Sequence, residues 1–358
     1  MKVVRLLPLV CVAIMGCGSG GGSNGAGGGG SAANTTAFRA VSLISDQAGV
    51  ALTDANLVNP WGIAIDPAGG FWISDNGRNV VSVYTGGAGG SQIVNTGITV
   101  NVPGGVPTGQ VFNGSPDFVI TSGGVTGPAS FIYASETGQI SASTLAYAAQ
   151  TVRIVPGAVY KGLAIGNNAT GNFLYAANLA TGRIDVFDKN FAPATLAGTF
   201  TDPAIPAGFV PFNIQNLGRR LFVTYAKQDR TQTSDVPGAG NGFVDMFDTS
   251  GNFIRRLVSQ GPLNSPWGLV IAPANFGRFS NALLVGNFGD GRINAFDATT
   301  GAPMGALSDN AGNPIVIQGL WGLILGNGAG AGERNALYFT AGPGGEQHGL
   351  FGRLDIVP

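Results

Sequence analysis

One stretch of this chain occurs twice, and this repetition limits the possible folds more than any other feature. Residues 58–84 read VNPWGIAIDPAGGFWISDNGRNVVSVY, and residues 264–297 read NSPWGLVIAPANFGRFSNALLVGNFGDGRINAFD. Both open with Pro-Trp-Gly and continue with large and small residues in alternation. Because alternation with a period of two is typical of β-strands, the pattern predicts a repeated unit that is built from strands.

Aligning the chain on the Pro-Trp-Gly motif gives six copies of the repeat. They begin at Pro60, Pro116, Tyr160, Pro211, Pro266 and Leu320. Their second residues stand at 61, 117, 161, 212, 267 and 321, in steps of 56, 44, 51, 55 and 54. Strand-rich repeats of this length indicate the blades of a β-propeller. We therefore predict an all-β fold, a six-bladed β-propeller with four-stranded antiparallel blades.

The two ends of the repeat array predict how the ring closes. The last copy stops after three strands, while an unused strand at about 38–45 precedes the first copy. A ring closed by this N-terminal strand would leave no open sheet edge. Gly62 and Ala64 lie opposite the large residues of the first strand, and we hypothesise that such small residues let neighbouring blades approach closely near the axis.

The composition argues against a nucleic-acid partner. Only 10% of the residues are charged, the formal net charge is −1, and there is no basic tract. Binding to phosphates requires Lys and Arg residues in clusters, and this sequence contains no such cluster. We expect a monomer with no nucleic-acid partner.

The first residues predict export. Residues 1–16 combine Lys2 and Arg5 with a short apolar run, as in a signal peptide. Ile14-Met15-Gly16-Cys17 resembles the lipobox of bacterial lipoproteins, which implies cleavage before Cys17 and acylation of its thiol. A conventional signal peptide is the alternative.

The rest of the N-terminal segment fits the lipoprotein interpretation. Residues 17–35 read as a Gly/Ser-rich tether, and 36–358 as a single propeller domain. The chain's two cysteines are Cys11 and Cys17, so that domain has no disulfide. We expect a lipid-anchored, extracytoplasmic protein of the bacterial cell envelope, at the outer membrane if the cell has two membranes, whose contact with the membrane is the lipid anchor.

Two family resemblances follow from the repeat. The repeat resembles NHL-type propeller repeats over nearly all of 57–357. It begins with Pro-x-Gly-aliphatic-Ala-aliphatic-Asp, continues with an aromatic-rich strand and ends with Asn/Gly-x-x-Ile-x-x-Phe. The motifs NPWG, TYAKQD and GFVDMFD also resemble a secreted bacterial propeller family that is associated with exosortase-sorted (PEP-CTERM) proteins. This chain lacks the Pro-Glu-Pro segment of the sorted members. The resemblance implies a fold and a location, and no activity.

Strand connectivity predicts where a site would lie. The loops that lead into the first strand of a blade and those between its second and third strands share one side of a propeller, here called the front face. Loops carry function more often than scaffold strands do. The ligand-binding candidates on this face are Asn59, Asp75, Asn76, Glu136, Asn178, Lys227, Asp229, Asn287 and His348. Glu346 lies near His348, and the insertion 227–241 could fold over the face.

A calcium site is one interpretation of these residues. Ca²⁺ takes six to eight oxygen ligands, and Asp75/Asn76, Glu136, Asn178 and Asn287 occupy matching places in four blades. Six-bladed lactonases of the gluconolactonase type hold a central divalent ion with such residues. If a metal is bound, the expected ligands are Glu136, Asn178 and Asn287. The alternative is that Asn and Asp simply suit tight turns, in which case no cofactor is needed.

Three other patterns are not interpreted as sites of their own. Asp188, Asp248 and Asp297 recur before turns on the opposite side, here called the back face, and are predicted to cap those turns. His348 is the only histidine, and no G-x-S-x-G motif supplies a nucleophile for it. The tryptophans at 61, 267 and 321 share one phase of the repeat, which predicts packing between blades.

The leading functional hypothesis is a propeller that binds a small molecule or a protein through its front face, without catalysis. The alternative is a calcium-dependent, lactonase-like hydrolase or lyase that acts on a small ester, lactone or sugar derivative, with Glu136 available as a carboxylate base. A purely structural envelope component is a third possibility.

Overall fold

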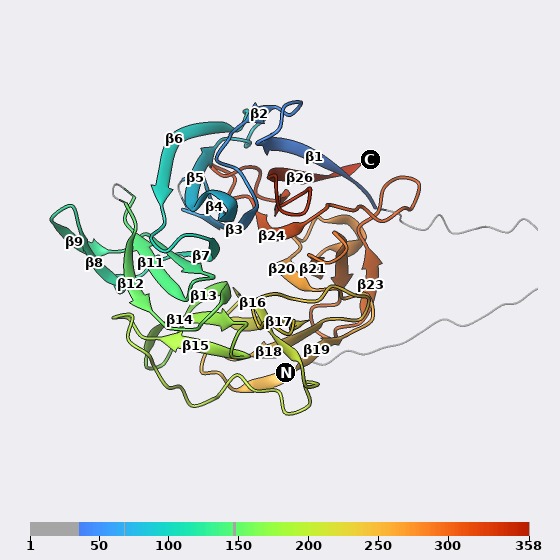
Figure 1. The fold of residues 1–358 in the computed structure, drawn as a ribbon. Helices are drawn as coiled ribbons and strands as arrows, with labels where there is room; N and C mark the ends of the chain where they lie inside the picture. The colour runs from blue at the N-terminus through green and yellow to red at the C-terminus, as the bar shows by residue number, and fades with distance from the viewer. Residues whose placement is uncertain (1–35, 68, 146–147, 358) are drawn as a thin grey trace, which may run out of the picture. The chain divides into compact units, whose positions relative to one another are not determined.

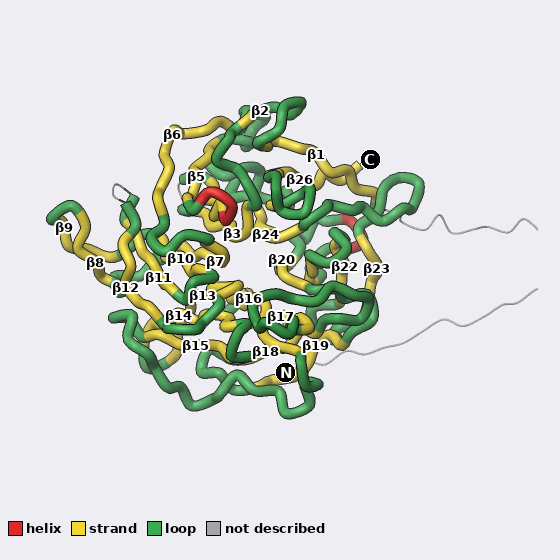
Figure 2. The backbone as a smooth tube through the Cα atoms, in the orientation of Figure 1, coloured by secondary structure: helices red, strands yellow, loops and turns green. Residues whose placement is uncertain are grey.

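The described part of the chain is a ring of six small antiparallel sheets. The structure is a computed structural model that describes residues 36–67, 69–145 and 148–357. Figure 1 shows the sheets following one another around a common axis in chain order. Figure 2 shows that nearly all regular structure is strand; the two helices, η1 (Asn76–Arg78) and η2 (Gly277–Phe279), are single 3-10 turns. The prediction of a six-bladed β-propeller is confirmed.

Each blade begins with an inner strand at the axis and proceeds outward. Blade 1 contains β3 (Pro60–Ile65), β4 (Phe71–Asp75), β5 (Val80–Thr85) and β6 (Val94–Asn101). Blade 2 contains β7 (Pro107–Phe112), β10 (Phe131–Ser135), β11 (Gln139–Ser143) and β12 (Gln150–Ile154), with the hairpin β8 (Val119–Ser122) and β9 (Val125–Pro128) inserted. Blade 3 contains three strands, β13 (Tyr160–Asn168), β14 (Gly171–Asn178) and β15 (Arg183–Phe187).

The second half of the ring repeats this order. Blade 4 contains β16 (Phe209–Leu217), β17 (Arg220–Lys227), β18 (Phe243–Phe247) and β19 (Phe253–Ser259). Blade 5 contains β20 (Pro266–Ile271), β21 (Leu283–Asn287), β22 (Ile293–Phe296) and β23 (Pro303–Ala306). Blade 6 contains β24 (Leu320–Leu325), β25 (Leu337–Ala341), β26 (Leu350–Val357), β1 (Ala37–Ser45) and the short β2 (Leu52–Thr53).

The N-terminal strand closes the ring, as predicted. β1 pairs antiparallel with β26, the last strand of the chain, from Ala37 opposite Val357 to Ser45 opposite Leu350. The short β2 adds to β1 in parallel. Because the first and last strands lie in one sheet, the hydrogen bonds of this sheet tie the two ends of the ring together.

The start of blade 2 corrects the sequence analysis. The inner strand is β7 at Pro107–Phe112, whereas the copy predicted at Pro116 lies in the connection that leads to β8. The prediction was wrong because Pro107-Thr108-Gly109-Gln110 keeps Pro-x-Gly but has polar residues where other copies have large apolar ones. Pro116-Asp117-Phe118-Val119, in contrast, offers a Pro with apolar residues after it, although it lacks the glycine. The backbone supports the placement of blade 2 at Pro107. The residue just before the Pro of an inner strand has a positive φ in three blades, 46° at Asn59, 42° at Val106 and 46° at Ser265.

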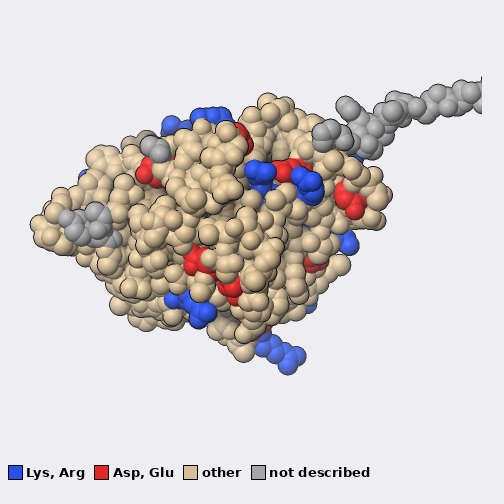
Figure 3. Space-filling view, turned by 90° about the horizontal axis from the view of Figure 1, so that it is seen from above, with Lys and Arg blue, Asp and Glu red and all other residues tan. Residues whose placement is uncertain are grey.

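The core is divided between the blades. The described residues form one hydrophobic cluster at each of the six blade–blade interfaces and a seventh at the axis. Trp72 on Phe131 illustrates such an interface, with ring centroids 4.0 Å apart between blades 1 and 2. In the described residues no helix is long and apolar enough to cross a membrane. On the side shown in Figure 3, charged residues form only small, scattered groups.

Glycines let the inner strands approach one another. A Cβ built at the third position of an inner strand would lie 2.1–2.6 Å from an atom of the next inner strand. This holds at Gly62, Gly109, Gly162, Gly268 and Gly322. In blade 4, where β16 begins two residues earlier, the equivalent residue is Asn213, and its Nδ2 donates to the carbonyl of Trp267 in blade 5 at 2.7 Å. The hypothesis that small residues allow close approach at the axis is confirmed.

The turn-capping prediction is also confirmed. Oδ1 of Asp188, of Asp248 and of Asp297 each accepts hydrogen bonds from backbone amides of the turn that follows it. These carboxylates therefore stabilise loops of the back face.

A buried ionic cluster lies beside the connection from blade 3 to blade 4. Arg256 on β19 pairs with Asp202, and its Nε lies 3.4 Å from Oδ1 of Asp245, which is fully buried on β18. Burial raises the pKa of Asp245 to about 7, and the charge of Asp202 adds to the rise while Arg256 opposes it. The carboxyl of Asp245 is thus protonated more readily in the folded protein than in the unfolded chain.

We predict that Gly62→Ala destabilises the propeller by about 1–3 kcal/mol, because the new methyl group would lie 2.5 Å from the carbonyl oxygen of Thr108. The measurement is urea unfolding followed by tryptophan fluorescence. Gly127→Ala on β9 is the control, since no atom lies within 4 Å of its built Cβ. Equal stability of the two variants would contradict the role of the glycines at the axis.

We predict that Asp245→Asn removes part of the pH dependence of stability. Because the folded pKa lies above the unfolded one, this group's contribution is fully present below about pH 4 and is lost as the pH rises towards 7. The loss is at most about 1.4 kcal/mol per pH unit. Denaturant unfolding between pH 4 and pH 8 should show a steeper fall for the wild type than for the variant, and parallel curves would refute the assignment.

Candidate functional site

A cavity of about 260 Å³ opens on the front face at the axis of the ring. Its floor consists of the rings of Trp61, Trp321 and Phe288. Trp61 stacks on Trp321 at 3.5 Å between ring centroids, and Phe288 stacks on the same ring at 4.0 Å. Its polar wall consists of Asn59, Asn76, Glu136, Lys161, Thr233, Ser234, Asp235 and Glu346. The cavity thus combines an aromatic base with charged and amide walls.

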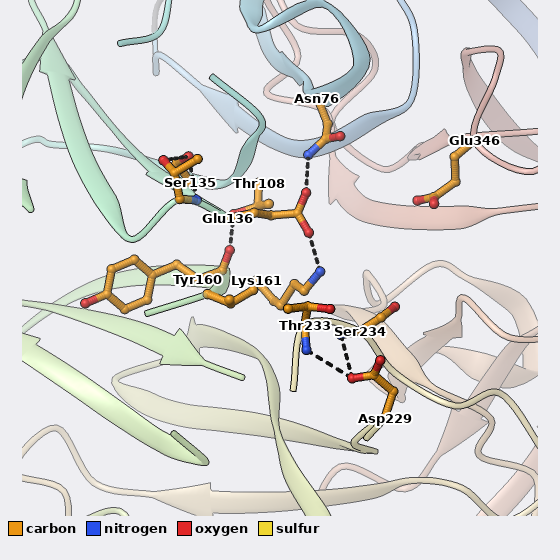
Figure 4. Close-up of polar contacts among 12 residues, drawn as sticks. Asn76, Thr108, Ser135, Glu136, Tyr160, Lys161, Asp229, Thr233, Ser234 and Glu346 are labelled. Atoms are coloured by element: carbon orange, nitrogen blue, oxygen red, sulfur yellow. Dashed lines mark hydrogen bonds and ion pairs between the residues drawn. The ribbon is translucent and has the colours of Figure 1, made fainter. Parts of the chain in front are cut away.

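A lysine–glutamate pair lies on one side of this cavity. Lys161, the second residue of β13, is 4% exposed and forms an ion pair with Glu136, which follows β10. Asn76 donates from Nδ2 to the other carboxylate oxygen of Glu136 at 3.1 Å. The ammonium of Lys161 lies 5.1 Å from the centroid of the Trp61 ring. Figure 4 shows Glu136 held between Asn76 and Lys161.

An amide network lies on the other side. Nδ2 of Asn59 donates to Oδ1 of Asn76 at 3.3 Å and to Oε1 of Glu346 at 3.2 Å, while the indole N–H of Trp321 donates to Oδ1 of Asn59 at 3.0 Å. Burial raises the pKa of Glu346; the bond from Asn59 offsets part of the rise, and the charge of Glu136 adds to it. In Figure 4 the carboxylate of Glu346 faces Glu136 across the opening.

The insertion between β17 and β18 forms part of the wall. Thr233, Ser234 and Asp235 line the cavity. Asp229 supports this loop, because its Oδ1 accepts from the amides of Thr233 and Ser234 at 3.0 and 3.1 Å. Burial raises the pKa of Asp235, while the Ser265 hydroxyl and the charge of Lys161 lower it. The insertion therefore reaches the front face with an acidic group directed to the axis.

A second, larger cavity lies on the axis below the tryptophans. It measures about 410 Å³ and is lined by the inner strands of all six blades, including Gln110, Asn213 and Trp267. The centroid of the Trp267 ring lies 6.1 and 5.8 Å from those of Trp61 and Trp321. Since Trp267 lines this back-face cavity and the other two line the front-face cavity, the tryptophan cluster separates the two.

Only some of the candidate residues share the front-face cavity. Asn59, Asn76 and Glu136 line it. Asp75 is fully buried in blade 1, where it accepts from the Ser82 hydroxyl at 2.6 Å and where burial raises its pKa well above the usual range. Asn178 donates to Asp185 at 2.8 Å within blade 3.

The remaining candidates also lie outside the cavity wall. Asn287 is directed into blade 5, where its Nδ2 donates to the Pro262 carbonyl and to Asp290. Lys227 is exposed, and Asp229 supports the insertion from outside the cavity. Nδ1 of His348 lies 2.9 Å from Oδ2 of Asp46. Their front-face loops had suggested convergence, but Asn287, Asp229 and His348 bond to partners of their own, and Lys227 is exposed.

The set proposed for a metal is therefore separated. Of Glu136, Asn178 and Asn287, only Glu136 lies in the front-face cavity. Within the described residues, no group of three or more His, Cys, Asp and Glu side chains is arranged so that it could hold a metal ion. The donor set that the calcium interpretation requires is not assembled at this cavity.

Two important wall residues were missed by sequence reasoning. Lys161 takes the place that Trp61, Trp267 and Trp321 hold in their copies. A lysine at a position that is otherwise aromatic could have indicated a functional residue. Asp235 lies in an insertion without periodicity, so that no pattern predicted its direction. The tryptophans pack together as predicted, yet two of them also form the floor of a cavity.

Comparisons with known proteins find one repeat family, similar structures and similar sequences. The NHL repeat family matches residues 57–84, the first copy. Among solved structures, a virginiamycin B lyase from Staphylococcus aureus matches with a TM-score of 0.49 and 12% identity, over 90% of this chain and 89% of that one. A nidogen–laminin complex matches with a TM-score of 0.45 and 14% identity, over 80% of this chain and 84% of that one. Likenesses of this degree say nothing about activity.

Two similar sequences come from Acanthamoeba polyphaga mimivirus. Uncharacterized protein R648 is 32% identical over 89% of this chain and 80% of its own length, and Uncharacterized protein L690 is 34% identical over 84% and 81%. Both relatives are viral, and the resemblance to exosortase-sorted bacterial proteins stays a prediction. The chain belongs to the family of uncharacterised proteins that includes R648 and L690 of this virus.

Proposed function

We propose that this protein is a binding protein whose ligand, a small polar molecule, occupies the front-face cavity, and that it does not catalyse a reaction. The observation that carries the proposal is the ion pair between the buried Lys161 and the partly exposed Glu136 in the wall of an open cavity at the hub. Burying an ion pair adds little stability compared with apolar residues of the same size. Its position beside an aromatic floor is therefore better explained by recognition than by folding.

The floor supports the same conclusion. Ligand sites typically combine aromatic surface with a few convergent polar groups. Here Asn59 and Asn76 offer amides, and Asp235 and Glu346 offer carboxyls, over two stacked tryptophans. At about 260 Å³ the cavity suits a ligand smaller than a typical drug molecule. A small-molecule ligand fits this cavity better than a protein partner does.

The proposed setting is extracytoplasmic, with a monomer anchored by a lipid on Cys17. This part of the proposal rests on the sequence alone, because the signal peptide 1–16 and the tether 17–35 lie outside the described residues.

A panel of amines, amino acids, carboxylates and monosaccharides tests the binding proposal. We expect at least one class to raise the melting temperature of the wild-type domain, because a ligand that binds only the folded state stabilises it. In Thr233→Trp the shift should disappear, since an indole at this wall position fills the cavity.

The matched control is Thr299→Trp, which places the same ring on an exposed residue of a back-face turn, outside the cavity wall. Stabilisation by the panel should persist in this control. If no compound shifts the melting temperature of the wild type, or if the shift survives in Thr233→Trp, then the ligand site has been placed wrongly.

The calcium-dependent hydrolase or lyase makes a different prediction. Because Glu136, Asn178 and Asn287 do not share one cavity, we expect EDTA and added calcium to leave the melting temperature unchanged. Differential scanning fluorimetry with both additives provides the measurement. A calcium-dependent rise in the wild type that Glu136→Gln abolishes would replace the binding proposal with the catalytic alternative.

A further inference from the structure

The charges in the front-face cavity do not balance. Three carboxyl groups, those of Glu136, Asp235 and Glu346, line it together with one lysine. Lys161 is already paired with Glu136. In the described part of the chain, no Lys, Arg or His lies within ion-pair distance of Asp235 or Glu346. Two acidic groups therefore face the cavity without a cationic partner.

The aromatic floor already accommodates one cation. The Lys161 ammonium lies over the Trp61 ring, 5.1 Å from its centroid. Cations are attracted to the faces of Trp and Phe rings by the quadrupole of the ring. Phe288 and Trp321 add further aromatic surface to the same wall. Carboxylates above aromatic faces form an environment that favours an organic cation.

An unused donor points to a second feature of the ligand. The Trp61 side chain is only 3% exposed and lines the cavity, but its indole N–H has no hydrogen-bond partner among the described residues. The indole groups of Trp267 and Trp321, in contrast, donate to the Lys161 carbonyl and to Asn59. A buried donor without a partner is costly, and a ligand acceptor would satisfy it once a small shift of the surrounding side chains exposes the nitrogen.

We propose that the ligand of this cavity is a small organic cation, an ammonium compound that also carries a hydroxyl or carbonyl acceptor, as amino alcohols and amino sugars do. This inference rests on the proposed function, since it names the ligand class of the same cavity. The ammonium group pairs with Glu346 and Asp235 above the aromatic floor, and the acceptor takes the Trp61 N–H. Glu136 stays paired with Lys161.

The groups facing Glu346 are consistent with this assignment. Burial raises the pKa of Glu346, and the charges of Glu136 and Asp235 add to the rise. The hydrogen bond from Asn59 and the charge of Lys161 lower this pKa. A cation that approaches would lower this pKa and stabilise the ionised form.

Isothermal titration calorimetry with matched probes tests the proposal. D-glucosamine is compared with D-glucose, and choline with 3,3-dimethyl-1-butanol, which has the same shape without the charge. We expect at least one cation to bind the wild type at least about tenfold more tightly than its neutral counterpart, as is typical for a charged hydrogen bond. Glu346→Gln, which keeps the size of the side chain, should remove most of this preference.

The control is Glu333→Gln, the same change at an exposed residue in the connection from β24 to β25 on the back face. It should bind the cations like the wild type. Equal affinity for charged and neutral probes, or an undiminished preference in Glu346→Gln, would overturn the cationic assignment.

The outcome separates the two proposals. If neutral or anionic compounds of the panel bind in a manner that Thr233→Trp blocks, while no cation is preferred, the site is real and its ligand class is wrong. If nothing binds, both proposals fail.

Discussion

The close approach of six inner strands around one axis is the constraint on which the rest of the structure depends. At the third position of each inner strand a side chain would collide with the next strand, and five of the six blades carry glycine there. In blade 4 Asn213 instead bonds the backbone of blade 5. This contact sets the radius of the ring, so that apolar residues farther out can pack between neighbouring blades. It also fixes where the residue just before each glycine must lie.

The residue just before each of these glycines determines which side chains fill the axis of the ring. Trp61, Trp267 and Trp321 occupy this position in three blades and fill the axis with mutually packed rings. In blade 3 it is Lys161, a charged side chain where the architecture favours an aromatic one. Its burial is offset by Glu136 and by the face of Trp61. Since an apolar residue would serve stability at least as well, we propose that Lys161 marks a place where the ring serves recognition rather than packing.

The sequence predicts the ring better than the site, for a physical reason. Strand alternation and a repeat of about 50 residues can be recognised in the sequence because every blade packs against its two neighbours in the same way. Only the start of blade 2 was misplaced, since Thr108 and Gln110 replace the usual apolar residues. Asn59, Asn76 and Glu136 were placed at the cavity because their loops lead to the hub. Asn178 and Asn287 share such loops, but partners within their own blades, which no periodic pattern encodes, turn them away.

The cavity is largely formed before any ligand arrives. The insertion that carries Asp235 is held by its own hydrogen bonds, from Val236 N–H to the Lys227 carbonyl and from the loop amides to Asp229. Asn59 and Glu346 keep φ values of 46° and 67°, uncommon for residues other than glycine, because the network around them fixes both backbones. A preformed wall loses little conformational freedom on binding. In the proposed binding role, the ring would supply rigidity and the few charged residues at its hub would supply selectivity.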